Sequence, residues 1–519
     1  MGKSERPLTF SGSTNGQKLH ASPRPFDSHL EECGAFSFYQ VLVLLITQLS
    51  YVTVSGSMLC TVFDNLKPLV KTCHDEEFVS LIQNASTSID FCKCKNATLE
   101  TEFDSLIVHL GVACKGNYVA TSMSTAVMAG GVIGSIIFGY LADRFGRKPC
   151  LISCLAGCVL INIVFPFIAE GLTIVIIVLL LLGLFAGGYL VISVVPPVEV
   201  TTNRWRMLCN CLHGWPFGCM VMALTAYLSR RWNIYHLALG IEGLPFLAAH
   251  FFISESPRWL LQHGQPTKAQ KVLRRIASFN RKEPLKHAVM FYPDEEDDQQ
   301  KSSVVNYTYF DLIRDKVVLL PLLVLSYSWF SGGVISFGIY FDVGGMAGSI
   351  FLKTFLMGLF KGTTGFIPYP LSRVLGRKPI LVTSIVITSF SAWGTVILYY
   401  VGKAEYMPVL AVIGIGAIDP MWKINHLMSV ELFPTVVRSM SRGVVNVSSR
   451  LASLVAPQVA YLSTFLAPLP FMIYGSMTIL HIIMVIRYLP ETRYLQLPET
   501  MSIKKDERNN VYTTESTDV

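Results

Sequence analysis

The chain contains twelve apolar runs, each long enough to cross about 30 Å of hydrocarbon as an α-helix of about 20 residues. They lie near residues 38–63, 118–140, 150–169, 172–195, 207–228, 234–253, 317–341, 347–371, 379–401, 407–429, 441–465 and 469–489. Only 15% of the 519 residues are charged, whereas soluble domains carry about 25%. Water cannot solubilise so much apolar surface, and the sequence therefore predicts an all-α membrane protein.

Two long hydrophilic inserts, 64–116 and 254–316, interrupt the apolar runs. Short loops rich in Lys and Arg alternate with loops that hold few, which is the pattern that orients helices in a membrane. The pair Arg230-Arg231 is the one exception. The predicted division is a cytoplasmic segment 1–35, a six-helix bundle 36–253 with an extracellular loop 64–116, a cytoplasmic helical loop 254–316, a second bundle 317–489 and a cytoplasmic tail 490–519. Both termini then face the cytoplasm.

The first insert combines cysteines with glycosylation sequons. Cys73, Cys92, Cys94 and Cys114 lie inside it, and all twelve cysteines precede residue 220. Its sequons begin at Asn84 and Asn96, so an oxidising, extracellular location is expected, with two disulfide bonds and attached glycans. The pairing of these cysteines in disulfide bonds stays open, because Cys60 lies close to the loop and is a further candidate partner. The spacing of Cys92 and Cys94 is too tight for a zinc pair, and neither a metal nor another cofactor is expected.

A period of about 230 residues relates the two halves of the chain. The segment 139–149 recurs as 370–379, and 254–258 corresponds loosely to 490–493. Glu199 and Arg206 recur as Glu431 and Arg438, seven residues apart in both copies. Two related six-helix halves are typical of a transporter that rocks around a central site.

Charged residues of these repeats are predicted to gate the inner side by pairing across the seam between the halves. The alternative is that they only anchor helix ends at the lipid headgroups. The expected gating residues are Asp143, Arg144, Arg147, Glu199, Arg206, Arg377, Glu431 and Arg438.

Segment 139–149 resembles the signature loop of the major facilitator superfamily. Together with 255–260 and 431–438 it makes the chain similar to the organic cation, anion and zwitterion transporters, over about residues 36 to 500. The resemblance implies the major facilitator fold, with two pseudo-symmetric six-helix bundles. It also implies alternating-access transport of small organic ions at the plasma membrane, without a prosthetic group. A monomer is expected, with no nucleic-acid partner, since the net charge of +7 is explained by the loops that orient the helices.

The family's members divide by substrate charge. Its cation carriers have acidic residues in the eleventh and eighth spans, where this chain has Arg450 and Lys361. Its anion carriers share the basic residue in the eleventh span, but their basic residue in the eighth span matches Gly365 here. The resemblance thus favours organic anions. An organic cation or a carnitine-like zwitterion is the alternative, with Asp419 or Glu242 as counter-charge.

Three basic residues fall at intermediate depth in the predicted spans: Lys361, Lys423 and Arg450. Each such charge costs about 2.5–3.5 kcal/mol on insertion scales. For two of these residues the sequence leaves an alternative to substrate binding. Lys423 lies one turn from Asp419, so it is alternatively explained by an internal ion pair. Lys361 is alternatively explained by snorkelling, in which its ammonium group reaches the membrane interface. A guanidinium can bind a carboxylate through two parallel hydrogen bonds. The predicted substrate-binding residues are Arg450, Lys361, Lys423 and Asp419, with Trp215 and Phe337 at positions where the resembling family carries cavity aromatics.

Other functional classes are less consistent with the sequence. It contains no arrangement of nucleophile and base, no phosphate-binding loop and no metal-ligand spacing, so an enzyme is not expected. A non-transporting receptor on the same fold is the rival hypothesis, and it predicts ligand binding without saturable flux. The second insert contains a predicted amphipathic helix at 267–279.

Overall fold

A computed structural model describes residues 26–67, 69–73, 97–100, 102–115, 117–283, 309–372, 374–434 and 437–493, with the backbone alone at 69–73 and 97–100. The first half contains α2 (Phe38–Leu49), α3 (Tyr51–Leu59) and α4 (Thr61–Asp64) in series, then α7 (Asn117–Phe145), α8 (Arg147–Ile168), α9 (Leu172–Ile192), α12 (Trp215–Ser229) and α13 (Trp232–His250). The second half contains α17 (Lys316–Asp342), α18 (Ile350–Phe366), α20 (Lys378–Tyr400), α21 (Met407–Ala417) with α22 (Asp419–Glu431), α23 (Arg438–Tyr461) and α24 (Leu469–Tyr488).

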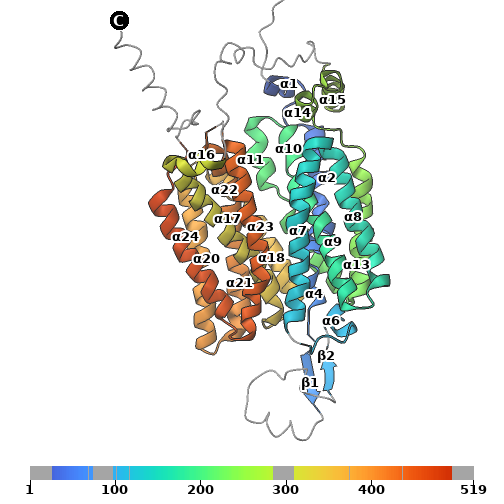
Figure 1. Cartoon of the computed structure of the whole chain (residues 1–519), viewed down its shortest axis with the longest axis vertical. Coiled ribbons are helices and arrows are strands. Elements are labelled where there is room, and N and C mark those ends of the chain that lie inside the picture. Colours follow the sequence, from blue (N-terminus) through green and yellow to red (C-terminus); the bar gives the residue numbers. More distant parts are fainter. Residues whose placement is uncertain are drawn as a thin grey trace, which may run out of the picture.

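These helices form two bundles that stand side by side (Figure 1). Shorter helices connect them or cap their ends: α1 (Phe26–Glu32), α6 (Leu106–His109), α10 (Val195–Glu199), α11 (Asn203–Cys211), α14 (Pro257–Gln262), α15 (Pro266–Phe279), α16 (Tyr309–Arg314) and α19 (Pro368–Leu371). Three 3₁₀ helices cover Val343–Gly345, Ala404–Tyr406 and Leu462–Thr464. The architecture is the predicted all-α membrane fold of two pseudo-symmetric six-helix bundles.

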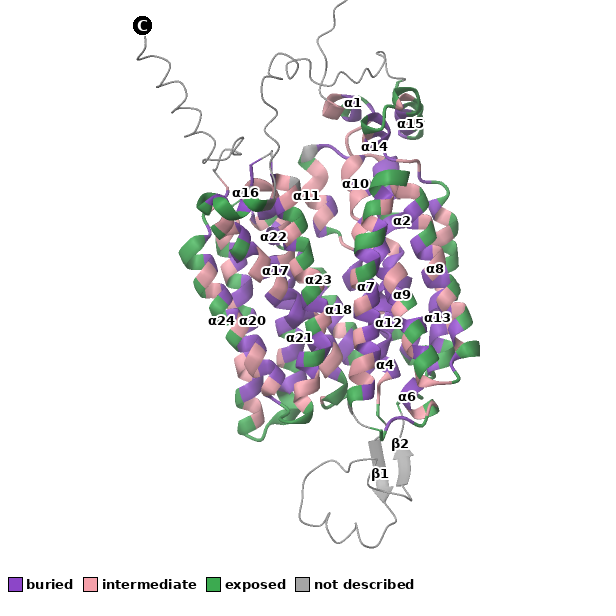
Figure 2. Ribbon diagram, in the orientation of Figure 1, coloured by how far each residue is buried: buried purple, intermediate pink, exposed green. Residues whose placement is uncertain are grey.

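Ten helical segments of the described chain are long and apolar enough to cross a membrane. The other two predicted spans correspond to α13 and α23, which are 19 and 24 residues long. Helix α23 carries Arg438, Arg442 and Arg450, and these charges lower its mean hydropathy. Large apolar side chains such as Leu160 and Phe167 project from the outer faces of the bundles, where Figure 2 shows many exposed positions. Such a surface is suited to lipid rather than to water.

Glycines allow α7 and α9 to pack backbone to backbone. A Cβ atom at Gly130 or Gly134 would collide with the carbonyl oxygens of Leu180 and Leu184. Helix contacts inside membranes commonly contain small residues, because close packing, rather than the hydrophobic effect, holds helices together there. The first half is therefore held together by contacts that tolerate no side chain at these positions.

The two ends of the bundles differ. At one end, here called the α15 end, α1, α14 and α15 share an apolar cluster that includes Leu30, Trp259, Leu273 and Ile276. Helix α15 corresponds to the amphipathic helix predicted at 267–279. At the opposite end, here called the ribbon end, β1 (Leu69–Cys73) pairs antiparallel with β2 (Ala97–Glu100) (Figure 1). The sequence analysis did not predict these strands.

Candidate functional site

A cavity of about 280 Å³ lies between the two halves. Helices α11 and α12 supply one wall, and α18 and α22 supply the other. A cavity near this volume admits a small organic molecule, since ligand pockets begin at about 300 Å³. Its lining residues are Cys211, Leu212, His213, Pro216, Phe217, Met220, Lys361, Gly362, Phe366 and Asp419.

Two lysines share one carboxylate at this cavity. The Nζ atom of Lys361 lies 3.6 Å from Oδ1 of Asp419, and Nζ of Lys423 lies 3.8 Å from Oδ2. All three side chains are buried. Lys361 points inward, with its ammonium 5.9 Å from the centre of the Tyr340 ring, rather than snorkelling to an interface. Lys423 forms an ion pair with Asp419, which was the alternative to substrate binding in the sequence analysis. The group of three retains one net positive charge.

Gly365 leaves the space that the shared carboxylate occupies. A Cβ atom at this position would collide with Oδ2 of Asp419. Gly365 lies one helical turn beyond Lys361, where the resemblance expects a basic residue in anion carriers. A basic side chain here would displace the carboxylate, so this chain places its eighth-span charge on Lys361 instead.

Arg450 provides a second positive charge, and it has no carboxylate partner. It is half-buried on α23, and among the residues that the structure describes it makes no ion pair and no side-chain hydrogen bond. The side chain of Tyr51, on α3 of the other half, is fully buried together with its hydroxyl group. That hydroxyl lies 2.8 Å from Ser193 Oγ and 3.2 Å from His213 Nε2. His213 lines the cavity, so the Tyr51 hydroxyl contacts the cavity wall.

The two predicted aromatic residues meet between the halves. The rings of Trp215 and Phe337 pack edge to face, with their centres 5.8 Å apart. Tyr51 packs edge to face on Trp215 at 6.5 Å. Tyr51, Trp215 and Phe337 therefore form one aromatic group between the halves, and of these three Trp215 and Phe337 were predicted from the sequence.

The halves also touch at the ribbon end, around Phe351 of α18. Its ring stacks on that of Phe63 at 5.8 Å and contacts those of Phe103 at 6.4 Å and Tyr227 at 5.6 Å. The guanidinium of Arg230 lies 5.1 Å from the Phe351 ring centre and 4.3 Å from that of Tyr227. The sequence analysis missed this contact, but Arg230 was its exception to the charge pattern of the loops.

Charged residues at the α15 end form two clusters. In the first cluster, Arg147 pairs with Asp143 at 2.7 Å and with Glu199 at 3.5 Å, and its backbone N–H donates to Glu255 at 2.9 Å. Asp143, Arg147 and Glu199 belong to α7, α8 and α10 of the first half, and Glu255 lies in the segment that leads into α14. Glu255 was not predicted to take part, although the repeat analysis had noted its segment.

The second cluster repeats this arrangement in the second half. Arg377 pairs with Glu431 at 2.9 Å, and its backbone N–H donates to Glu491 at 2.9 Å. Burial raises the pKa of Glu491, but backbone N–H donors, including those of Arg377 and Arg493, outweigh it and hold that pKa below its usual range. The described pairs join residues of one half each and do not cross the seam, and a gating role for them stays a prediction.

Three other predicted gating residues lie outside the clusters. Arg144 contacts the Tyr140 hydroxyl at 3.4 Å, and Nε of Arg438 donates to the carbonyl of Phe433 at 3.3 Å. Arg206 pairs with Asp27 at 3.4 Å and so ties α11 to α1. The last contact joins a bundle helix to the amino-terminal segment.

The predicted disulfide and glycosylation sites fall mostly outside the described side chains. Cys114 carries a disulfide bond. The side chains of Cys73, Cys92 and Cys94, and the sequons at Asn84 and Asn96, lie outside the described part of the chain. The pairing and the glycans therefore stay predictions.

Comparisons with known proteins agree with this geometry. The family model for sugar (and other) transporters matches residues 75–503. The chain belongs to this family. Solved structures of the xylose transporter XylE share its fold: the proton:xylose symporter bound to 6-bromo-6-deoxy-D-glucose superposes with a TM-score of 0.62 at 16% identity, covering 88% of this chain and 98% of that one. This transporter therefore has the major facilitator fold.

The curated relatives of this transporter carry differently charged ions. Solute carrier family 22 member 16 of Bos taurus is 28% identical over 411 residues, which are 78% of this chain and 71% of the relative. Human organic cation/carnitine transporter 2 is 27% identical, over 76% and 71% of the two chains. Organic anion transporter 3 of Oryctolagus cuniculus is 27% identical, over 77% and 74%. The comparisons identify a membrane transporter related to carriers of organic cations, carnitine and organic anions, and do not choose among these substrates.

Proposed function

We propose that this transporter carries small organic ions across the plasma membrane by alternating access, with organic anions as its preferred substrates. The observation that carries the preference is the excess of positive charge between the halves. Lys361 and Lys423 share a single carboxylate, and Arg450 has none among the described residues. Charges at this depth are costly unless they are compensated. A negatively charged head group entering the cavity would compensate them.

The alternative substrates need a carboxylate that lines the cavity and has no ion pair with a lysine, and neither candidate meets both conditions. Asp419 is engaged by both lysines. Glu242 accepts a hydrogen bond of 2.7 Å from Thr225 on the neighbouring helix and does not line the cavity. A cation or the ammonium end of a zwitterion would therefore have to displace a lysine from Asp419 first.

The expected orientation places the α15 end in the cytoplasm and the ribbon end outside. Both Arg–Glu clusters lie at the α15 end, which agrees with the enrichment of basic residues on the cytoplasmic side. The strands β1 and β2, which belong to the predicted extracellular loop, lie at the ribbon end (Figure 1). We propose that both termini are cytoplasmic and that a single chain transports.

The test is uptake by proteoliposomes of a carboxylated dye and of a quaternary ammonium dye, each followed by fluorescence. Arg450→Ala should reduce carboxylate uptake by about tenfold or more, because a hydrogen bond to a charged group contributes about 1.5–3 kcal/mol. Arg487→Ala is the matched control, since Arg487 lies exposed at the end of α24. The control should transport like wild type.

Two results would contradict this proposal. Efficient wild-type uptake of the ammonium dye, with carboxylate uptake at background, would replace the anion preference by the cation alternative. Saturable binding of either dye without flux into the vesicles would favour the non-transporting receptor.

A further inference from the structure

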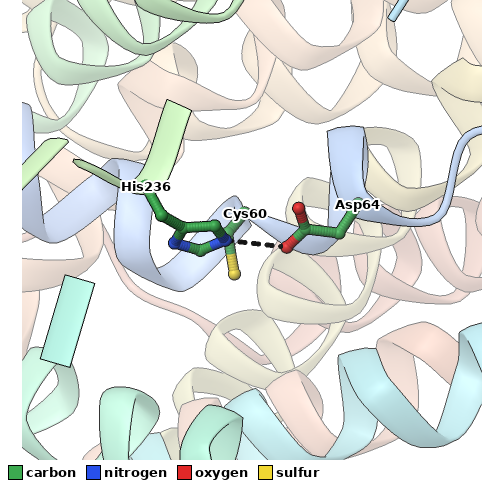
Figure 3. Close-up of side chains that lie close together, drawn as sticks. All are labelled: Cys60, Asp64 and His236. Atoms are coloured by element: carbon green, nitrogen blue, oxygen red, sulfur yellow. Dashed lines mark hydrogen bonds and ion pairs between the residues drawn. The ribbon is translucent and has the colours of Figure 1, made fainter. Parts of the chain in front are cut away.

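Cys60, Asp64 and His236 form a buried cluster apart from the central cavity. Cys60 and Asp64 lie one helical turn apart at the end of the first membrane segment, and His236 faces them from α13 (Figure 3). All three residues are fully buried, and their potential ligand atoms lie within 4.8 Å of one another. Thiolate, carboxylate and imidazole are the groups that bind zinc in proteins.

The hydrogen bonds around Asn162 determine which ring nitrogen of His236 carries a hydrogen. The amide nitrogen of Asn162 donates both its hydrogens, to Ser57 Oγ at 2.8 Å and to the carbonyl of Cys158 at 2.8 Å. Ser57 must accept there, because its own hydroxyl donates to the carbonyl of Thr53. The amide oxygen of Asn162 therefore accepts from Nδ1 of His236, 2.8 Å away. Nδ1 carries the hydrogen, and Nε2 is left to face Asp64.

In the tautomer with its hydrogen on Nδ1, Nε2 of His236 is an acceptor like Oδ2 of Asp64, yet the two atoms lie only 3.2 Å apart. Two acceptors at this distance repel each other unless a cation lies between them, either a proton or a metal ion. Among the described residues the second carboxylate oxygen, Oδ1, is buried and accepts no hydrogen bond of normal geometry, and the Cys60 thiol lies beside the carboxylate. A metal ion, unlike a proton between Nε2 and Oδ2, would bind the thiolate and the carboxylate together.

We propose that Cys60, Asp64 and His236 bind a zinc ion. At zinc–ligand distances of about 2.0–2.2 Å, tetrahedral geometry sets the nitrogen and oxygen ligands about 3.3 Å apart, which agrees with the observed separation. The thiol gives up its proton to solvent on binding. One thiolate, one carboxylate and a neutral imidazole balance the charge of Zn²⁺, so the buried site carries no net charge. Asn162 acts as the outer partner that fixes the imidazole, as is usual for zinc-bound histidine.

This cluster was not predicted from the sequence, because His236 lies 172 residues beyond Asp64. Its place in the fold indicates a structural role. Phe63, between the two ligands on α4, stacks on Phe351 of the second half at 5.8 Å. An ion that joins α4 to α13 would fix the backbone that presents Phe63 to the ribbon-end contact.

The test is the metal content of the full-length protein, purified in detergent, incubated with zinc sulfate, freed of unbound metal by gel filtration and measured by inductively coupled plasma mass spectrometry. Wild type should retain about one zinc ion per chain more than Cys60→Ser and Asp64→Asn do. Cys154→Ser is the matched control, because Cys154 is another buried free thiol of the same half. The control should retain as much zinc as wild type.

Substitution of zinc by cobalt tests the ligands even if a variant gives little folded protein. The absorption spectrum is recorded only on the monodisperse fraction from gel filtration. Co²⁺ should give a thiolate-to-metal charge-transfer band in the near ultraviolet in wild type and in Cys154→Ser, and Cys60→Ser should lack it. Equal zinc content in wild type and Cys60→Ser would overturn the proposal. So would a wild-type protein that shows neither retained zinc nor the cobalt band.

Discussion

The carboxylate of Asp419 is the group whose removal tests the description of the central site most directly. Asp419→Asn keeps the shape of the side chain but removes the charge that two buried ammonium groups share. The Nζ atoms of Lys361 and Lys423 lie 3.6 and 3.8 Å from its oxygens. We expect the variant to be strongly destabilised, because both lysines lose their only described carboxylate partner.

The distances set the magnitude. At an effective dielectric constant of about 20, each ammonium–carboxylate attraction is about 4–5 kcal/mol, and desolvation offsets part of it. Removal of one partner from a buried pair typically costs about 3–5 kcal/mol. For a chain of 519 residues, with an unfolding entropy of about 2.1 cal/mol/K per residue, that corresponds to a fall of roughly 3–5 °C in the unfolding midpoint.

The assay is thermal unfolding of the detergent-purified protein, followed by intrinsic fluorescence. Glu170→Gln removes an exposed carboxylate and should leave the midpoint unchanged. Combining Asp419→Asn with Lys361→Met should recover about half of the loss, because one ammonium group then remains instead of two.

A midpoint of Asp419→Asn within about 1 °C of wild type would refute this reasoning, since it corresponds to a loss of only about 1 kcal/mol or less. It would mean that the lysines obtain their charge compensation elsewhere. A double variant less stable than Asp419→Asn would equally contradict the assignment of two ammonium groups to one carboxylate.

Three further predictions concern packing and charge. Gly134→Ala should destabilise the protein by about 1–3 kcal/mol in thermal unfolding, because the added methyl group meets a backbone carbonyl, whereas Gly139→Ala, which has room, should not. Gly365→Ala should push the shared carboxylate off its lysines and lower the unfolding midpoint, and Gly362→Ala, with only an ordinary contact, should lower it far less. Glu491→Gln should destabilise the protein at pH 7, because the pKa of Glu491 is depressed in the folded state. The difference in stability between the variant and wild type should shrink as the pH falls below 4.5, and a pH series of unfolding midpoints measures it.

The helices were predictable because the membrane demands long apolar segments. Even α23 was found from the sequence, although its arginines keep it below the hydropathy of the other spans. The β1–β2 ribbon was not predicted, because it lies in a polar loop without the alternation that marks a half-buried strand.

Contacts between distant residues were harder to infer than helices. The repeat showed that Arg147 and Arg377 are equivalent, but it gave no information on which helix ends they face. Their backbone N–H groups meet Glu255 and Glu491 because Gly146 and Gly376 adopt positive φ angles of 108° and 91° and turn the chain tightly. Sequence spacing does not reveal such turn geometry.

The charged residues of the central site were predicted from the sequence, but the ion pairs that connect Lys361, Lys423 and Asp419 into one group were not. The pair of Asp419 and Lys423 follows from helical spacing, since the residues are four positions apart. The addition of Lys361 depends on how α18 packs against α22, which only the fold determines. The same applies to Tyr51, whose hydroxyl meets His213 at the cavity wall.

The confinement of each Arg–Glu cluster to its own half has a mechanical consequence. When the halves rotate relative to each other, neither cluster has to break or re-form, so each half can move as a rigid body. We therefore expect the free-energy barrier between the two conformations to be set at the ribbon end, where the aromatic rings around Phe351 must separate before this end can open.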